Sequence, residues 1–262
     1  MRLKILGCGT STGVPIPGCG CAVCASPHPR NQRLRTSALL MLDSGENILI
    51  DASTDLRQQA LKWGIKQIHA TLFTHSHADH ILGIDDLRAF NYVMNCAMPC
   101  YATAHTWEDI KRIFAYVFRH DPNYEGGAPP KLTTHEFTHF QEFELLATRI
   151  MPFELEHGRL KVTGFKIGEL AYATDCKVIP HASKEILRGI KFLILDGLRY
   201  EAHRTHMTIP EAIDAAQELG AGKTYLTHLT HNVDYVEVNA KLPKGVELAY
   251  DGLELEISSS TP

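Results

Sequence analysis

The sequence Thr74-His75-Ser76-His77-Ala78-Asp79-His80 directly follows the apolar run 70–73. It contains three imidazoles and one carboxylate. A lone histidine is more often a surface residue or a hydrogen-bonded core residue, but four ligand-type side chains so close together are hard to explain as solvated surface. Imidazole and carboxylate ligands both suit zinc, manganese or iron. The stretch therefore predicts a metal site at the end of a strand and leaves the identity of the metal open.

Patterning outside this stretch predicts a mixed sequence of strands and helices. Alternating or continuous apolar runs predict strands at residues 3–6, 38–42, 47–50, 69–73, 132–137, 144–152, 160–167, 170–174, 191–195, 224–227 and 253–257. Helical periodicity with end signals predicts helices at residues 55–63, 81–92, 106–118, 183–188 and 209–219. Strands followed by mixed elements, twice over, predict two mixed sheets packed face to face with helices outside, an αββα sandwich.

The domain organisation is expected to be simple. The chain shows no short repeat and no low-complexity segment, so residues 1–257 are predicted to form one domain and residues 258–262 a disordered tail. With 44% apolar and 21% charged residues, the composition is that of a globular protein and excludes wholesale disorder.

Charge and hydropathy limit the partners. The formal net charge of -4 gives no broad attraction to the backbone of a long nucleic acid, although a small anionic substrate held by metals remains compatible. The N-terminal residues 1–7 are too short and too soon interrupted by glycine to be a signal peptide, and no apolar run approaches a bilayer span. A cytoplasmic location without a membrane partner is the expectation.

Three of the seven cysteines, Cys19, Cys21 and Cys24, lie within six residues after a turn rich in glycine and proline. In a reducing compartment such clustering favours metal binding over disulfides. The other four cysteines lack this spacing, and buried small apolar side chains are the simpler interpretation for them.

The stretch 74–80 resembles the Thr-His-x-His-x-Asp-His signature of the metallo-β-lactamase superfamily, and the resemblance continues through Leu155-Glu156-His157, Ala173-Thr174-Asp175 and Leu226-Thr227-His228. It implies that fold and two catalytic divalent ions, zinc or manganese with iron also possible. It assigns His75, His77 and His157 to one ion, and Asp79, His80 and His228 to the other. Asp175 would bridge them, and a hydroxide shared by the ions would attack the substrate.

Within the superfamily, nearly the whole chain is similar to the family of phosphoribosyl 1,2-cyclic phosphate phosphodiesterases and to the tRNase Z-like branch. The glycine loop 6–15 and the Cys-x-Cys-x-x-Cys motif carry this similarity. It implies a structural zinc ion held by Cys19, Cys21, Cys24 and His231. It also places His206 beside the substrate phosphate as a candidate catalytic and substrate-binding residue, with Asp79 as a second catalytic candidate and His203 as the second choice for contacting substrate.

These observations predict a dinuclear metal-dependent hydrolase acting on a small or cyclic phosphodiester, cytoplasmic and capable of forming a homodimer. Residues 85–130 are longer than the resemblance implies and are predicted to include a lid over the pocket. Three alternatives stay open: RNA 3′ processing as in tRNase Z, thioester or lactam hydrolysis, and a non-catalytic metal-dependent binding module.

Overall fold

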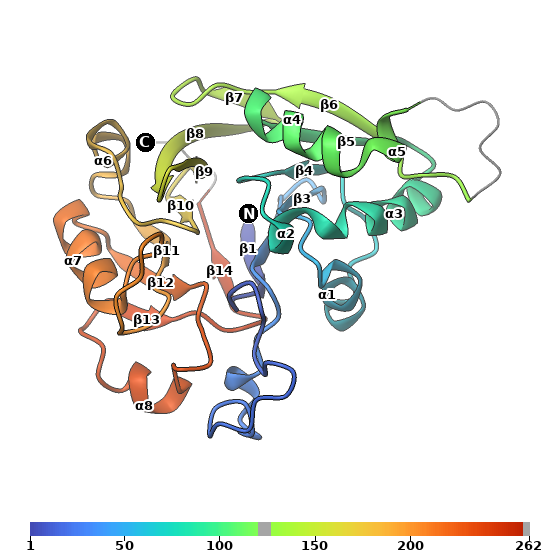
Figure 1. Cartoon of the computed structure of the whole chain (residues 1–262). Coiled ribbons are helices and arrows are strands. Elements are labelled where there is room, and N and C mark those ends of the chain that lie inside the picture. The colour runs from blue at the N-terminus through green and yellow to red at the C-terminus, as the bar shows by residue number, and fades with distance from the viewer. Residues whose placement is uncertain (120–126, 259–262) are drawn as a thin grey trace.

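Two sheets, each of seven strands, pack against one another with helices on their outer faces in the computed structural model, which describes residues 1–119 and 127–258 (Figure 1). The first sheet has the order β14 (Glu254–Glu256), β1 (Arg2–Gly7), β2 (Ser37–Met41), β3 (Asn47–Ile50), β4 (Ala70–Leu72), β5 (Met98–Ala102) and β6 (Leu132–Glu136). The second has the order β13 (Val246–Leu248), β12 (Lys223–Thr227), β11 (Phe192–Asp196), β10 (Leu170–Ala173), β9 (Leu160–Ile167), β8 (Thr148–His157) and β7 (Phe143–Leu145). The αββα sandwich predicted from the sequence is confirmed.

The helices divide between the two outer faces. Beside the first sheet lie α1 (Leu56–Trp63), α2 (Ala78–Ile81), α3 (Leu87–Met94), α4 (Ala104–Ile113) and α5 (Ala115–Phe118), with the 3-10 turn η2 (Leu82–Asp86) among them. Beside the second sheet lie α6 (His181–Leu187), α7 (Ile209–Leu219) and α8 (Tyr235–Asn239), and a short 3-10 turn η1 (Pro29–Asn31) lies in the N-terminal loop. Among the described residues, none of these helices combines the length and apolar content needed to cross a membrane.

Both faces of the central strands are apolar because each face has its own core. In β3, Ile48 and Ile50 belong to the large cluster between the sheets, whereas Leu49 belongs to the cluster under the helices. Neighbouring side chains of a strand point to opposite faces, so this division follows directly from the sequence Asn47–Ile50. Trp107 of α4 is 1% exposed and fills the helix-side cluster.

Strand pairing changes from antiparallel to parallel within each sheet. In the first sheet β1, β2 and β3 are antiparallel, and β3 to β6 are parallel. In the second sheet β8, β9 and β10 are antiparallel, and β10 to β13 are parallel. The carboxyl ends of parallel strands meet at one edge of a sheet, and the loops at these edges can therefore bring distant residues together.

Three predicted elements were wrong in their bounds. The single helix expected at 81–92 is divided among α2, which ends at Ile81, the 3-10 turn η2 and α3, which begins at Leu87. The single strand expected at 144–152 is a hairpin, β7 and β8, because Leu146 and Ala147 turn the chain with φ of 51° and 57°. The single helix expected at 106–118 begins earlier, at Ala104, and is interrupted at Phe114, where α4 ends and α5 follows.

The segment 85–130 is only partly separate from the sandwich. Strand β5, which the sequence analysis did not predict, pairs with β4 and β6 inside the first sheet. Helices α3, α4 and α5 lie on either side of it along the chain. A lid role for the segment stays a prediction, and its residues 120–126, like the predicted tail beyond residue 258, lie outside the described residues.

Candidate metal centre

The sequence-predicted ligands come from four places that the two sheets bring to one edge. The stretch 74–80 follows β4 and enters α2, His157 is the last residue of β8, Asp175 follows β10, and His228 follows β12. Each lies at or just beyond the carboxyl end of its strand. Their convergence is therefore a consequence of the strand topology.

Asp175 lies at the centre of this cluster. Its carboxylate oxygens are 3.1 Å from His80 Nε2, 3.4 Å from His228 Nε2 and 3.9 Å from His75 Nε2. It shares one group of potential ligand atoms, all within 4.8 Å of one another, with His77 and His157, and another with His75 and His80. A carboxylate with imidazoles on both sides has the position that a bridging ligand requires.

The other predicted ligands lie on the two sides of Asp175. The rings of His75, His77 and His157 are mutual neighbours, with centroid separations of 4.6, 5.2 and 5.9 Å. On the other side Asp79, His80 and His228 form a group of potential ligand atoms within 4.8 Å. The structure thus brings together all seven residues that the sequence analysis assigned to two metal ions.

The unsatisfied nitrogens of this cluster test whether metal ions fit. His75 Nε2, His80 Nε2 and His228 Nε2 have no hydrogen-bond partner among the described residues, although the three residues are at most 2% exposed. Leaving a buried polar atom without a partner costs about 1–3 kcal/mol. Several such nitrogens facing shared carboxylates are what a cation site requires, and the residues present therefore fit metal binding.

Protonation differs across the centre. Burial would lower the pKa of His80 and His228, but Asp175 raises the pKa of both above the ordinary value, to about 9 for His228, so positive charge is favoured on that side. Burial lowers the pKa of the His75 imidazole well below its ordinary value, so the neutral form that binds metal prevails. Burial alone would raise the pKa of Asp175, but the neighbouring His228 and His80 hold it well below the usual range. The Asp175 carboxylate is therefore ionised, and the neutral His75 imidazole is free to coordinate a metal ion.

Asp51 fixes the orientation of His80, and the sequence analysis did not find it. Its Oδ2 accepts hydrogen bonds from His80 Nδ1 at 2.7 Å and from Thr74 Oγ1 at 2.8 Å, and its Oδ1 accepts one from the Thr74 amide at 2.8 Å. Asp51 is fully buried and has a φ of 63°. Carboxylates that hold the second nitrogen of a ligand histidine set its ring orientation and basicity. The only local signal was a lone aspartate after the apolar strand β3.

His206 lies beside the same centre and has its own carboxylate. Its Nδ1 donates to Asp196 Oδ2 at 2.6 Å, and its ring centroid lies 4.5 Å from that of His157 and 4.6 Å from that of His228. Asp196 is fully buried at the end of β11 and was also missed by the sequence analysis. Because Nδ1 is occupied by Asp196, Nε2 is the nitrogen available to a substrate.

His203, the second choice from the sequence, is placed differently. Its ring centroid is 5.0 Å from that of His206, and its Nδ1 lies 3.3 Å from both the amide and the hydroxyl of Thr205. It belongs to none of the groups of potential metal ligands among the described residues. Its geometry suits support of the 203–206 turn.

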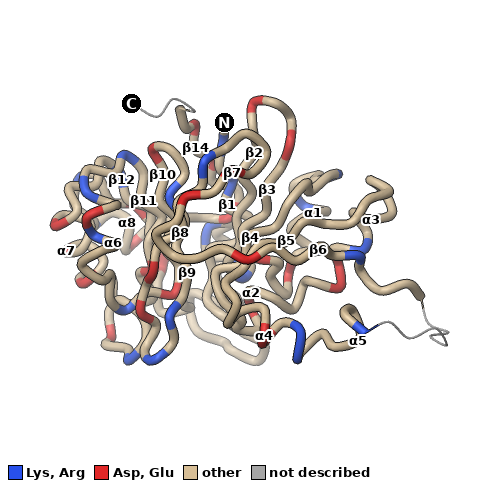
Figure 2. The backbone as a smooth tube through the Cα atoms, turned by 90° about the horizontal axis from the view of Figure 1, so that it is seen from above, with Lys and Arg blue, Asp and Glu red and all other residues tan. Residues whose placement is uncertain are grey.

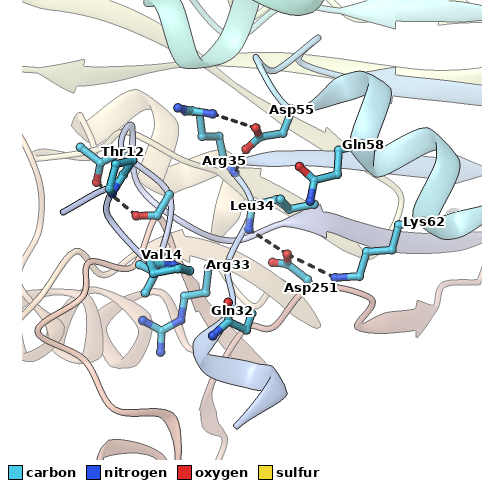
Figure 3. A pocket seen from close by; sticks show the side chains of 13 residues that line it. Thr12, Val14, Gln32, Arg33, Leu34, Arg35, Asp55, Gln58, Lys62 and Asp251 are labelled. Carbon is cyan, nitrogen blue, oxygen red and sulfur yellow. Dashed lines mark hydrogen bonds and ion pairs between the residues drawn. The ribbon is translucent and has the colours of Figure 1, made fainter. Parts of the chain in front are cut away.

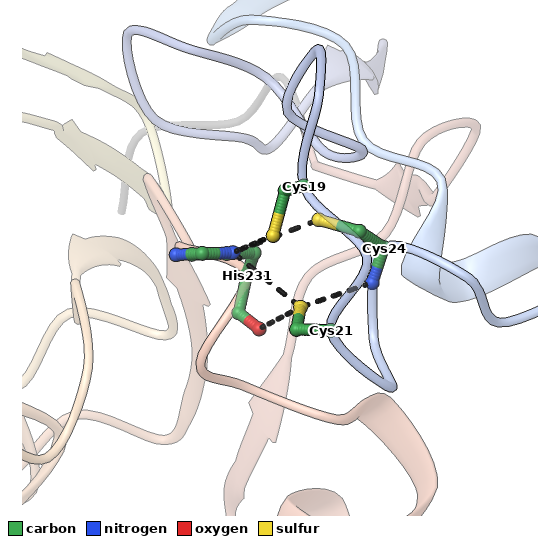
Figure 4. A group of neighbouring side chains, drawn as sticks. All are labelled: Cys19, Cys21, Cys24 and His231. Atoms are coloured by element: carbon green, nitrogen blue, oxygen red, sulfur yellow. Dashed lines mark hydrogen bonds between the residues drawn. The ribbon is translucent and has the colours of Figure 1, made fainter.

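The Cys-x-Cys-x-x-Cys motif and His231 meet as the sequence predicted (Figure 4). The Sγ atoms of Cys19, Cys21 and Cys24 lie 3.3, 3.5 and 3.6 Å from His231 Nδ1. All four side chains point toward one centre in Figure 4. Three sulfurs and one nitrogen are the donor set of a closed tetrahedral site, the kind that structural zinc ions occupy.

Both centres depend on one loop, because His228 and His231 are three residues apart. Arg33, which is 1% exposed, donates to the carbonyl oxygens of Thr230 at 2.8 Å and Val233 at 2.6 Å. A backbone bond from Leu229 to the Cys8 carbonyl at 2.8 Å adds a further tie. The loop is therefore fixed to the N-terminal segment from both ends.

A separate pocket of about 310 Å³ lies between the N-terminal loop and α1 (Figure 3). Its charged groups pair with one another: Arg35 contacts Asp55 at 2.7 Å, and Asp251 accepts from the Leu34 amide at 2.8 Å and lies 3.9 Å from Lys62. None of the sequence-predicted site residues lines it. These pairs hold the N-terminal loop against α1.

The profile of the β-lactamase superfamily domain matches residues 46–229, which span every predicted ligand of the catalytic centre. The chain belongs to the metallo-β-lactamase superfamily. Members of this superfamily are metal-dependent hydrolases, and the chain has the overlapping His/Asp groups and the Cys₃His group that could hold metal ions.

The chain is similar to several solved and curated proteins. A solved diphosphatase of the PhnP family is 41% identical, with a TM-score of 0.90 and 98% of each chain covered. Zn²⁺-bound PqqB from Methylobacterium extorquens has the same fold, with 20% sequence identity and a TM-score of 0.75. The match covers 98% of this chain and all of the PqqB chain. The octanoyltransferase of Porphyromonas gingivalis is 41% identical over 259 residues, 97% of this chain but 51% of the relative. The chain thus spans about half the length of that curated relative.

Proposed function

We propose that this member of the superfamily hydrolyses a small phosphodiester with two divalent metal ions held on either side of Asp175. The observation that carries the proposal is the convergence of partnerless, buried imidazole nitrogens on that carboxylate. His75, His77 and His157 would hold one ion, and Asp79, His80 and His228 the other. When bound, such a pair of ions lowers the pKa of water toward neutrality and neutralises charge on the phosphoryl oxygens.

The protein's own groups prepare this chemistry. Asp51 and the Thr205 carbonyl each hold the second nitrogen of a ligand histidine, His80 and His157, so their rings cannot rotate away from the centre. Asp79 adds negative charge on the side of His228, with the two side chains 3.5 Å apart. Because these histidine rings are already held in place, the site does not have to reorganise during the reaction.

The position of His206 is the reason for proposing a phosphodiester substrate rather than a thioester or a lactam. With Nδ1 bonded to Asp196, its Nε2 faces the centre and can donate a proton to a non-bridging oxygen or to the departing alkoxide. Asp196 fixes the tautomer and the orientation of the ring. We therefore assign His206 the role of general acid and Asp196 that of a positioning residue.

Small phosphorylated substrates fit the charge distribution better than a long nucleic acid does. Acidic and basic residues are interspersed along the tube in Figure 2, and the net charge is -4. The PhnP-family relative is a diphosphatase, and a diphosphate linkage, like a phosphodiester, joins two groups through phosphorus and oxygen. tRNase Z-like RNA processing would require a basic surface to neutralise many phosphates.

The octanoyltransferase activity named for the P. gingivalis relative is not assigned to this chain. The chain covers 51% of that protein, so we assign octanoyl transfer to the part that has no counterpart here. A cytoplasmic location and a homodimer remain predictions from the sequence.

Turnover of a small panel tests the proposal. The metal-loaded protein should hydrolyse bis-p-nitrophenyl phosphate and a cyclic ribose phosphate, and it should leave a glutathione thioester, a β-lactam and a precursor tRNA intact. Asp175→Ala should lose this activity while keeping its circular dichroism spectrum. The matched control Asp214→Ala, at an exposed residue of α7, should keep full activity.

Near-normal phosphodiester turnover by Asp175→Ala would contradict the central role of that carboxylate. Preferential turnover of the thioester, lactam or tRNA would replace the phosphodiester by the corresponding alternative. Full metal occupancy without turnover of any probe would favour a binding module.

A further inference from the structure

Ser76 lies between two candidate metal ligands, and its side chain points away from them. The ring centroids of His75 and His77 are 4.6 Å apart, so both imidazoles lie on the same side of the chain. The Ser76 hydroxyl instead donates to Asp109 of α4, from Oγ to Oδ2 at 2.7 Å. Successive side chains of an extended chain alternate in direction, and His77 has an extended backbone with φ of -66° and ψ of 151°. The bond to Asp109 therefore holds the side of the chain opposite to the two histidines.

The proposed ligand histidines differ in how firmly their rings are held. In three of them, the second ring nitrogen has a partner in the protein: His75, His80 and His157. His228 lacks such a partner but is 2% exposed, so packing restricts its ring. His77 is exposed, and its side chain forms no hydrogen bond with another described residue. The orientation of the His77 ring therefore depends most on the backbone that carries it.

Helix α4 is a rigid support beside this stretch. Its Trp107 is 1% exposed and donates from Nε1 to the His135 carbonyl of β6 at 2.9 Å. The same ring packs edge-on against Phe73, with centroids 6.1 Å apart. Phe73 directly precedes the stretch 74–80. The helix and the start of the metal-binding stretch are thus anchored to each other through the core.

Asp109 is also restrained on its own helix. Arg112, one turn later, donates from Nη2 to Asp109 Oδ1 at 3.0 Å, which leaves Oδ2 to accept from Ser76. The Asp109 side chain is 28% exposed, so solvent screens its contacts only in part. A carboxylate is a stronger acceptor than a neutral oxygen. The bond from Ser76 therefore ends on a fixed, charged partner.

The other side-chain bonds of the stretch come from the segment after β3. Asp51 accepts from the amide and the hydroxyl of Thr74 at the start of the stretch. Thr54 donates from Oγ1 to the Ala78 carbonyl at 3.3 Å. Between these two points, the bond from Ser76 ties the middle of the stretch to a different element, α4. Loss of that bond would leave the middle of the stretch held only at its two flanks.

We propose that Asp109 is a positioning residue for the metal ligand His77, acting through the Ser76 hydroxyl. The inference rests on the proposed function for the assignment of His77 to one of the two ions. Without the bond, the exposed His77 ring would turn away from Asp175 more often, and the ion on that side would be held less tightly. The segment 85–130 would then contribute to metal affinity through α4, in addition to any role as a lid.

Competition with a chromophoric chelator, on the full chain, measures the effect. Asp109→Ala should raise the Kd of one catalytic ion about three- to tenfold, less than a direct partner of a ligand histidine would, because Asp109 acts through Ser76 and is partly exposed. Ser76→Ala should have the same effect, and the double variant should be no weaker than either single one, since both remove the same bond. Ser76→Thr, which keeps the hydroxyl, should retain the wild-type affinity. The matched control Glu108→Ala changes a neighbour on α4 that is 80% exposed, and it should leave every Kd unchanged.

Cobalt loading shows which site is affected. Thiolate-to-metal charge transfer in the Co²⁺-loaded protein reports on the Cys₃His site alone, and this absorption should titrate identically in wild type and Asp109→Ala. The d–d absorption of the catalytic centre should require more cobalt in the variant. The Tm of the metal-free proteins should agree, which separates positioning of a ligand from a general loss of stability.

Metal affinity is measured without turnover, so the two proposals fail separately. If Asp109→Ala raises the Kd while the wild type hydrolyses no phosphodiester, the positioning role stands and the proposed function fails. An unchanged Kd in Asp109→Ala overturns the positioning role. Additive effects of the Ser76 and Asp109 substitutions, or an equal loss of the ion from the Cys₃His site, overturn it as well.

Discussion

Replacing Asp51 by asparagine should weaken metal binding without removing any proposed ligand. The carboxylate is fully buried and accepts from His80 Nδ1 and from both the amide and the hydroxyl of Thr74. Asparagine has the same shape and tolerates the left-handed backbone that Asp51 adopts, with a φ of 63°. Its amide cannot accept three hydrogen bonds at once, so the bond that orients the His80 ring is lost or replaced by a repulsion between donors.

The magnitude follows from the kind of bond removed. Hydrogen bonds to a charged group contribute about 1.5–3 kcal/mol, which is roughly a 10- to 100-fold change in an equilibrium constant. This agrees with the usual cost of about 10- to 100-fold in metal affinity when the carboxylate behind a ligand histidine is changed. We therefore expect the Kd of the more weakly held catalytic ion to rise by about that factor.

Competition with a chromophoric chelator, followed by elemental analysis of the protein, measures this Kd. The matched control is Asp251→Asn, because the Asp251 side chain is only 3% exposed and accepts from the amides of Cys8 and Leu34, but it belongs to neither metal centre. The control should lose stability and keep its metal affinity. Equal affinities for wild type and Asp51→Asn would refute the idea that Asp51 controls the His80 ring.

Three further predictions concern other parts of the molecule. Cys21→Ser should release one metal equivalent and lower Tm, and an unchanged metal content would remove the structural-zinc assignment. Asp196→Asn should lower kcat by about 10- to 1000-fold with a much smaller change in KM and a shifted pH–rate profile, whereas a simple packing role would lower Tm and leave that profile in place. Burial raises the pKa of Asp251 to about 6 from 3.8, so its contribution favours folding below about pH 4 and declines as pH rises through 6. Between pH 4 and pH 7.5 the wild type should therefore lose up to about 3 kcal/mol relative to Asp251→Asn, and parallel pH curves from thermal unfolding would contradict this.

The sequence predicts the candidate site better than it predicts the groups that support it. The ligand residues of 74–80 were found because they are dense there, whereas His157, Asp175 and His228 came from the resemblance to the superfamily. Asp51 and Asp196 were missed because each is a single aspartate after an apolar strand, and nothing local distinguishes it from a turn residue. Only the side-by-side order of the strands shows which aspartates face the centre.

Element bounds followed the strength of local signals. Helix α7 begins with the capping box of Thr208 and Glu211 and ends at Gly220 in the left-handed conformation, and its predicted bounds are confirmed. The turn between β7 and β8 contains neither glycine nor asparagine, so nothing in the sequence marked it. Strand β5 was not predicted because it contains Pro99, and proline argues against a strand in the middle of a sheet.

The loop that carries both His228 and His231 has a consequence for the loss of a metal ion. His231 of this loop belongs to the Cys₃His site, and His228 of the same loop is a proposed ligand of the catalytic centre. Before the Cys₃His site is filled, hydrogen bonds, among them those of Arg33 and the Leu229–Cys8 bond, would hold this loop, so an ion at that site would add to the restraint on His228. Loss of the ion from the Cys₃His site would then also weaken the catalytic centre, whichever metal that centre uses.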